Sequence, residues 1–310
     1  MTTTELVIKL TCFIAAGYAV VKSGTVSHTF FKQFSAFLIT IPMSALIVRS
    51  FLGSSLSGEV LGLFGTTILC AVLMLTVLAL VGLAARKLHR NAAEGRICVF
   101  GMMTSNFNFF GIPIVEVLFG SEGILYYTVL TTLARVVYYG FPPFMLGSGH
   151  KLNLREFARQ MICPPVVALA VGFVLFFAQV QLPFVLNDVL NSLGNTASPL
   201  GMMLCGMTLA NADLKKALTR PILLVMSAIR LLAAPATVLG LCLLCRFPPL
   251  ISKLAVIYSM LPFGALMPTF ASRYCADEQS AIYGSVLVSL TTVLCMFTIP
   301  LWLHVMNTML

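Results

Sequence analysis

The stretch GMMTSNFNFFGIPIVEVLFG, residues 101–120, decides how this chain is interpreted. Inside an apolar run it collects polar side chains and helix breakers: Thr104, Ser105, Asn106, Asn108, Gly111, Pro113 and Glu116. Proline removes a backbone hydrogen bond and crowds the preceding turn, and glycine loosens the backbone further. The stretch therefore predicts a helix that is broken at Pro113 and polar around its break.

The chain around this stretch is apolar enough to be an integral membrane protein. Its 310 residues are 59% hydrophobic and 9% charged, with a mean hydropathy of +0.99. Soluble domains carry about 25% charged residues. The alternative, buried core helices of a soluble protein, is disfavoured because apolar runs long enough to cross a bilayer recur from end to end.

The apolar runs predict an all-α membrane protein of about ten transmembrane helices, with no soluble domain. The first run has no basic leader or small-residue cleavage site, so we expect it to be retained as a helix. The quoted stretch occupies most of the fourth span. The predicted spans are residues 4–22, 29–52, 60–86, 96–119, 123–146, 156–179, 184–210, 220–245, 251–275 and 279–306.

Basic residues orient these spans, because they gather in alternate connections. They lie after the first, third, fifth and seventh spans: Lys22, Lys32, Arg86, Lys87, Arg90, Arg96, Lys151, Arg155, Arg159, Lys215, Lys216 and Arg220. The positive-inside rule makes these connections cytoplasmic and predicts both termini on the outer side of the plasma membrane. Arg246 and Lys253, in the eighth connection, are exceptions. The net charge of +9 is mostly this pattern and needs no nucleic-acid partner.

Prolines at equal depth suggest that the chain is duplicated. Pro42 in the second span matches Pro199 in the seventh, and Pro113 in the fourth matches Pro268 in the ninth, both at an offset of roughly 155 residues. An odd number of spans per half forces opposite orientations, so residues 1–150 and 151–310 would form the inverted repeat typical of secondary transporters. Chance remains the alternative, since membrane helices tolerate proline.

The broken fourth span predicts a binding site. Freed backbone groups at membrane depth are tolerated only where protein or a cavity covers them. Half-helix N-termini carry partial positive charge and suit an anion. Asn106 and Asn108 add amide donors, and Ser105, Gly111 and Pro113 complete the predicted site. The alternative is that the amides tie neighbouring helices together.

Two arginines lie in the middle of predicted spans, at a cost of about 2.5–3.5 kcal/mol on insertion scales. Arg135 either binds a substrate carboxylate, as guanidinium groups do well, or forms a structural ion pair with Glu116. For Arg230 an ion pair is favoured, and Glu116 is again the candidate acid. Arg49 lies late in its span, where it can extend to water.

Several kinds of site are not indicated. The four histidines lie at span ends or in connections without metal-ligand spacing. Cys242 and Cys245 lie in an apolar helix and are interpreted as small core residues. The sequence has no nucleotide-binding loop. We therefore expect neither a metal nor a cofactor, and no ATP-driven transport.

The chain resembles the auxin efflux carrier family in two places. In the first half the pattern of Asn, Gly-(Ile/Leu)-Pro and Phe/Tyr-Gly is carried by Asn106, Gly111, Ile112, Pro113, Phe119 and Gly120. In the second half the closing segment is carried by Leu261, Pro262, Gly264, Ala271, Tyr274, Ser289, Thr291, Thr292, Pro300 and Leu301. The resemblance covers the whole length and is closest to the compact bacterial type, which has no long cytoplasmic loop.

The resemblance implies two inverted five-helix repeats whose broken fourth and ninth spans cross. Spans 1, 2, 6 and 7 would form a scaffold, and spans 3–5 and 8–10 a transport domain that slides against it. The fold would be related to that of bile-acid/sodium symporters and sodium/proton antiporters. One departure is that Leu266 and Met267 stand where the family often has Asn, followed by Pro268. Pro268 joins the expected site, but the ninth span is expected to give less polar contact.

The implied function is secondary transport of small organic anions, with carboxylates such as malonate or malate as substrates. Partners would be the substrate and the lipid bilayer, and a homodimer is left open. A sodium-coupled anion symporter is an alternative. A sodium/proton antiporter is disfavoured, because Glu116 is the only clear acid at depth. A membrane enzyme or receptor is a remote alternative, since Ser105 has no His at its depth.

Overall fold

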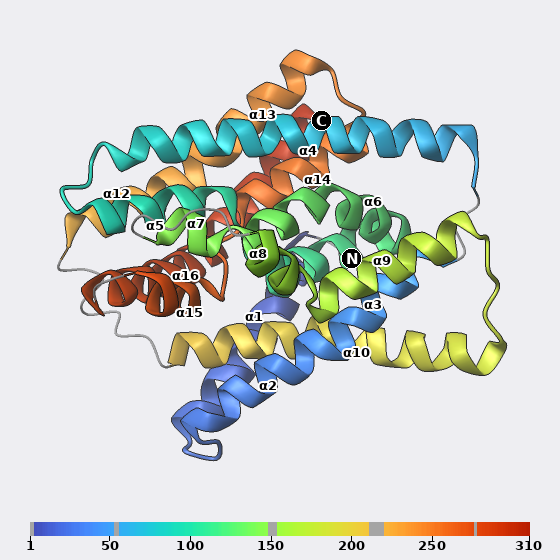
Figure 1. Ribbon diagram of the computed structural model, residues 1–310, viewed down its shortest axis with the longest axis horizontal. Helices are drawn as coiled ribbons and strands as arrows, with labels where there is room; N and C mark the ends of the chain where they lie inside the picture. Colours follow the sequence, from blue (N-terminus) through green and yellow to red (C-terminus); the bar gives the residue numbers. More distant parts are fainter. Residues whose placement is uncertain (1–2, 53–55, 148–153, 211–219, 276–277) are drawn as a thin grey trace. The chain divides into compact units, whose positions relative to one another are not determined.

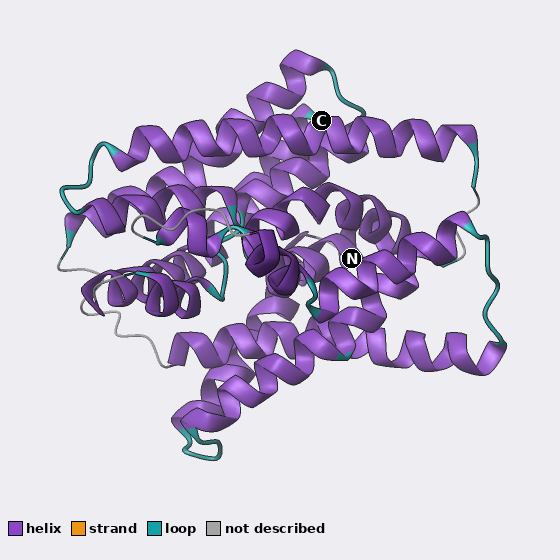
Figure 2. Ribbon diagram, in the orientation of Figure 1, coloured by secondary structure: helices purple, strands orange, loops and turns teal. Residues whose placement is uncertain are grey.

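The protein is described here by a computed structural model that covers residues 3–52, 56–147, 154–210, 220–275 and 278–310 (Figure 1). Helices make up nearly all of this part of the chain, and it contains no β-strand (Figure 2). The helices are α1 (Thr3–Lys22), α2 (His28–Thr40), α3 (Pro42–Phe51), α4 (Gly58–Arg86), α5 (Ala92–Met103), η1 (Phe107–Gly111), α6 (Ile112–Gly140), α7 (Pro142–Leu146), α8 (Leu154–Met161), α9 (Pro164–Phe177), α10 (Phe184–Ala210), α12 (Pro221–Ala228), η2 (Ile229–Ala233), α13 (Ala234–Cys245), α14 (Pro249–Met260), α15 (Met267–Tyr274) and α16 (Glu278–Met309).

Five helical segments among the described residues are long and apolar enough to cross a membrane. They are Gln33–Phe51, Gly58–Arg86, Phe107–Gly140, Pro221–Cys245 and Gln279–Met309. Pro164–Phe177 and Pro249–Met260 are shorter apolar helices. A multi-pass membrane protein follows from these lengths. That all ten predicted spans cross the membrane, as two inverted repeats, stays a prediction.

The chain divides into two compact units. Unit 1 comprises Met1–Leu69, Asn108–Thr132 and Ile162–Ala210, and unit 2 comprises Cys70–Phe107, Leu133–Met161 and Asn211–Leu310. Both α4 and α6 contribute residues to each unit. The predicted division into a scaffold and a transport domain stays a prediction.

Unit 1 is held together by close contact between α1 and α10. A Cβ atom added to Gly17 would lie 1.9 Å from the carbonyl oxygen of Met203, and one added to Gly206 would lie 1.9 Å from that of Ile14. Glycine at these two positions lets the backbones approach more closely than any side chain would allow, as small residues do in membrane helix pairs. This contact fixes the C-terminal half of α1 against the C-terminal half of α10.

In unit 2 the long apolar helix α16 packs against the segment 221–245. That segment widens into the π-helical turn η2 around Arg230, and such turns are frequent at functional sites. The indole Nε1 of Trp302 in α16 donates a 2.7 Å hydrogen bond to the carbonyl oxygen of Leu231 in this turn. The wide turn frees backbone carbonyls, and the bond from Trp302 satisfies one of them.

The helices break at other residues than the prolines predicted. The fourth span leaves helical geometry at residues 104–106, and the ninth at residues 261–266. Pro113 instead lies where the π-helical turn η1 passes into α6, inside the helical segment Phe107–Gly140, and Pro268 is the second residue of α15. At the start of α15 proline is tolerated, because the missing N–H would have no helical partner there. Pro42 likewise begins α3, whereas Pro199 lies inside the continuous helix α10.

Gly120 lies between the predicted fourth and fifth spans. It adopts φ +59° and ψ −149°, which is not helical, so two helical parts of α6 meet at a kink there. A side chain would be strained at this positive φ, so glycine is required.

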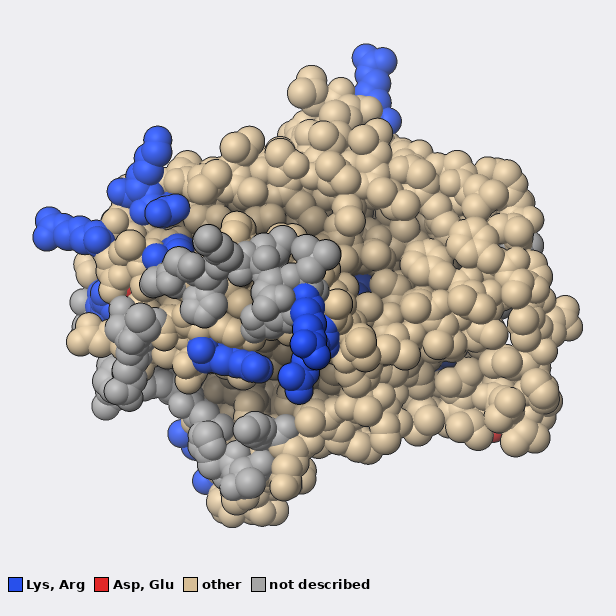
Figure 3. Space-filling model, viewed as in Figure 1, with Lys and Arg blue, Asp and Glu red and all other residues tan. Residues whose placement is uncertain are grey.

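Basic side chains gather around the connection between α4 and α5 in unit 2, and acidic ones are scarce on the same face (Figure 3). The arginines of the expected cytoplasmic cluster that are exposed there are Arg86 and Arg90. Lys151, Lys215 and Lys216, which belong to the same prediction, lie outside the described residues. The orientation of the termini stays a prediction.

Candidate functional site

The two broken spans meet in unit 2. Residues 104–106 and residues 261–266, which we call the junction, are linked by an isolated antiparallel bridge between Ser105 and Phe263. The amide of Asn106 donates a 2.9 Å bond to the carbonyl oxygen of Pro262, and the amide of Gly264 donates a 3.2 Å bond to that of Thr104. The two extended segments thereby satisfy backbone groups that the helix breaks release.

Side chains from three other helices complete the backbone bonding of the junction. The Tyr258 hydroxyl in α14 donates to the carbonyl oxygen of Met103 at 2.6 Å. The Tyr138 hydroxyl in α6 accepts from the amide of Leu266 at 2.7 Å, and the Thr291 hydroxyl in α16 accepts from the amide of Phe263 at 3.3 Å. All three of these side chains are buried. The junction is therefore a buried, hydrogen-bonded polar centre.

Arg230 lies at the centre of the junction and is fully buried. Its Nε donates to the carbonyl oxygen of Leu261 at 2.9 Å, and its Nη1 donates to that of Met102 at 2.7 Å. Its Nη2 bonds to the hydroxyl of Ser105. The first two acceptors lie at the C-terminal ends of α14 and α5, where a positive charge is favourable because the helix dipoles are negative. Arg230 thus joins the two broken spans.

Ser105 and Asn106 are brought to the junction as predicted site residues, and both are buried. The Ser105 hydroxyl donates to the carbonyl oxygen of Tyr258 at 2.6 Å. Arg135 is fully buried in unit 2, with its guanidinium carbon 5.0 Å from the centre of the Phe107 ring. Phe107 directly follows the junction, so Arg135 lies near it and has a cation–π contact there.

Other predicted residues are not part of the junction bonding described above. Asn108 and Gly111 lie in η1 and are buried, in the part of the chain assigned to unit 1. Pro113 and Glu116, also in unit 1, line a cavity of about 270 Å³. Pro268 belongs to unit 2 but begins α15, just beyond the extended segment. The binding role of each of these residues stays a prediction.

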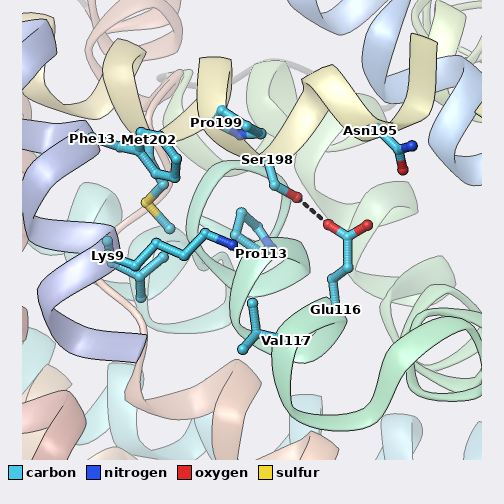
Figure 4. A pocket seen from close by; sticks show the side chains of 10 residues that line it. Lys9, Phe13, Pro113, Glu116, Val117, Asn195, Ser198, Pro199 and Met202 are labelled. Atoms are coloured by element: carbon cyan, nitrogen blue, oxygen red, sulfur yellow. Dashed lines mark hydrogen bonds between the residues drawn. The ribbon is translucent and has the colours of Figure 1, made fainter. Parts of the chain in front are cut away.

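The ion pair expected between Glu116 and Arg230 stays a prediction, and each of the two side chains makes other bonds. In unit 1, Glu116 Oε1 lies 2.9 Å from Nη2 of Arg49, and Oε2 accepts a 2.5 Å bond from the hydroxyl of Ser198 (Figure 4). Nη1 of Arg49 also donates to Oδ1 of Asn195 at 2.5 Å. Arg49 was expected to extend to water, but its side chain is only 15% exposed.

Sequence reasoning missed the tyrosines Tyr138 and Tyr258 and the partners of Glu116. Tyrosine in an apolar run gives no signal of its hydrogen-bond partner, because apolar and aromatic residues share the same helical spacing. The sequence does carry one signal for Ser198, because this residue precedes Pro199, the proline that pairs with Pro42. A polar residue beside that proline indicates a polar contact in the seventh span.

Comparison with known proteins identifies the family. A family model described as membrane transport protein matches residues 2–156 and 144–303. The chain belongs to this family, which includes the auxin efflux carriers. An uncharacterized transporter of Methanothermobacter thermautotrophicus is 25% identical over 308 residues, covering 97% of this chain and 98% of the relative. An uncharacterized transporter of Methanocaldococcus jannaschii is 24% identical over 308 residues, covering 96% of this chain and 97% of the relative.

Membership confirms the resemblance seen in the sequence and makes this member of the family a membrane transporter. It also indicates a transporter rather than an enzyme, so the remote alternative of a membrane enzyme is set aside. The printed names give no substrate for either relative.

Proposed function

We propose that this transporter is a secondary carrier of small organic anions, carboxylates, across the plasma membrane. The observation that carries the proposal is the junction: two broken helices joined at their breaks, with Ser105 and Asn106 buried there and fully buried arginines at positions 135 and 230. Broken helices with polar groups at membrane depth mark the binding sites of many secondary transporters.

The charge at the junction favours an anion. Arg230 is engaged with helix C-terminal carbonyls, so its role is structural. Arg135 is a second fully buried guanidinium near the break, with its guanidinium carbon 5.0 Å from the centre of the Phe107 ring. The helical segments that follow the breaks begin at Phe107 and Met267 and add partial positive charge. We propose Asn106 and Arg135 as the main substrate contacts.

We further propose that transport proceeds by alternating access with an elevator-like movement. Crossing fourth and ninth spans, a scaffold of spans 1, 2, 6 and 7, and a transport domain of spans 3–5 and 8–10 are parts of this proposal. The support for crossing is the bridge between Ser105 and Phe263, which pairs the breaks of those two spans. The family resemblance supports the rest, including termini on the outer side of the membrane.

Uptake of labelled carboxylates into proteoliposomes tests the function. We expect counterflow of malonate or malate with the wild-type protein. Asn106→Ala should weaken the apparent affinity by about 1–3 kcal/mol, because a buried anion would lose a donor. Asn187→Ala, at an exposed position of α10, is the matched control and should leave uptake unchanged. Normal affinity in Asn106→Ala at normal expression would remove Asn106 from the site.

Sodium coupling is the second candidate and is separated by the same assay. We expect counterflow to persist without sodium, because acids that could coordinate sodium are scarce in the spans. Absolute dependence of counterflow on sodium would instead identify a sodium-coupled symporter.

A further inference from the structure

The cavity of unit 1 lies between α1, α6 and α10 (Figure 4). Its volume of about 270 Å³ is just below the range of roughly 300–1,000 Å³ typical of pockets for drug-sized ligands, so its occupant is small. Most of its wall is apolar, and its polar groups come from four side chains. These four are Lys9, Glu116, Asn195 and Ser198.

The one acid in the cavity wall is already neutralised. Arg49 pairs with one oxygen of Glu116, and the Ser198 hydroxyl donates to the other. Both carboxylate oxygens therefore have partners within unit 1. A ligand cation would have to displace Arg49 or Ser198 to reach them, so the acid does not make this a cation site.

Lys9, an exposed residue of α1, places a positive charge at the cavity. Its side chain extends from α1 across the cavity toward Pro113 (Figure 4). In the part of the chain that the structure describes, neither an acid nor a hydrogen-bond acceptor is bonded to its ammonium group. A carboxylate bound in the cavity would pair with this charge and accept a charge-assisted hydrogen bond.

The rest of the wall selects the body of the ligand. Phe13, Val117 and Met202 offer apolar surface beside Lys9, and methionine adapts to differently shaped groups. A second carboxylate on the ligand would have to lie against this apolar surface or beside Glu116, and burying it without a partner would be costly. A cavity with one lysine and a largely apolar wall therefore suits a ligand that has a single carboxylate and a small apolar body.

We propose that the unit 1 cavity is a binding site for a small apolar monocarboxylate, whose carboxylate pairs with Lys9. The site uses none of the hydrogen-bonded groups of the junction. It therefore stands whether or not Asn106 and Arg135 bind the transported anion.

Binding of benzoate to the full-length protein, purified in a neutral detergent, tests the proposal by isothermal titration calorimetry. Lys9→Gln should weaken benzoate binding by roughly tenfold or more, since a hydrogen bond to a charged group is lost. Lys9→Arg keeps the charge and should retain most of the affinity. Lys22→Gln, an exposed lysine of the same helix, is the matched control and should bind as the wild type does.

Ligand variants test the chemistry of the site. In competition with bound benzoate, benzyl alcohol, which keeps the apolar body, and malonate, which carries two carboxylates, should each be at least roughly tenfold less effective than a second portion of benzoate. Val117→Phe places a ring in the cavity and should also abolish benzoate binding while the melting temperature holds. Loss of binding in Val117→Phe locates the ligand in the cavity independently of Lys9.

Three results would overturn the proposal. The first is equal benzoate affinity in wild type and Lys9→Gln. The second is that malonate competes for the benzoate site more tightly than benzoate itself does. The third is displacement of benzoate by phosphatidylglycerol added to the micelles, which would assign Lys9 to a lipid headgroup. Because these are binding measurements, their outcome is separate from the uptake phenotype of Asn106→Ala.

Discussion

Removing the guanidinium of Arg230 should destabilise the protein, because this buried side chain bonds to the backbone of both broken spans. In Arg230→Gln the carbonyl oxygens of Met102 and Leu261 lose charged donors at 2.7 and 2.9 Å. Each buried carbonyl left without a partner costs about 1–3 kcal/mol, so the sum is about 2–6 kcal/mol. Since Arg230 is fully buried, water does not compensate for this loss.

Equilibrium unfolding by SDS titration in mixed micelles measures this effect. Arg230→Lys keeps the positive charge but not the planar fork, so it should lie between wild type and Arg230→Gln. Arg90→Gln, in the exposed connection after α4, is the control and should stay within about 0.5 kcal/mol of wild type. If Arg230→Gln unfolds like the wild type but no longer binds carboxylates, Arg230 contacts substrate and the structural role is refuted.

Three further predictions concern packing, an ion pair and pH. Gly17→Ala should lower the melting temperature, at a cost of about 1–3 kcal/mol or more, because the added Cβ would overlap the carbonyl of Met203. The control Gly62→Ala has open space around the added Cβ and should leave the melting temperature unchanged. Equal melting temperatures for the two variants would show that α1 and α10 pack differently. A double-mutant cycle of Arg49→Gln and Glu116→Gln should give a coupling energy of about 1 kcal/mol in stability, since both side chains are partly exposed, and a coupling near zero would show that the pair contributes nothing. Burial, opposed in part by the hydrogen bond to the carbonyl of Ala85 and the charge of Glu94, lowers the pKa of His89 below its ordinary value of 6.5. The unfolded chain therefore binds the proton more readily, so stability should be full above about pH 6.5 and fall as the pH drops through the folded pKa; unfolding measured against pH should show this, and His89→Gln should remove it.

The positions of the helices could be predicted from the sequence because long apolar runs are local signals. The eighth predicted span, 220–245, coincides with the apolar segment Pro221–Cys245, and the seventh with α10 (Phe184–Ala210). Family membership could likewise be predicted, since short motifs in both halves were sufficient. The lengths of apolar runs and the presence of short motifs are local properties of the sequence, so predicting from them requires no knowledge of tertiary contacts.

The geometry of the candidate site could be predicted only in part. Ser105 and Asn106 stood out as polar residues in an apolar run, and both lie at the junction. The break itself was assigned to Pro113, because residues 104–106 contain neither glycine nor proline. Their extended backbone depends on pairing with residues 261–266, which no local pattern reports. The choice of Arg49 as the partner of Glu116 is also tertiary, and sequence spacing does not specify it.

The bridge at the junction has a consequence for how substrate preference can change among related carriers. Its two bonds run from the amides of Asn106 and Gly264 to the carbonyls of Pro262 and Thr104, so main-chain atoms alone make them. Any residue but proline can therefore replace Asn106, which we propose as a substrate contact, while the two backbone bonds between the spans are kept. Gly264 cannot be replaced in this way, because the ring of Tyr138 would lie 2.6 Å from an added Cβ. At position 106 the side chain can therefore change while the backbone pairing is kept, whereas at position 264 a change of side chain also disturbs the packing of the junction.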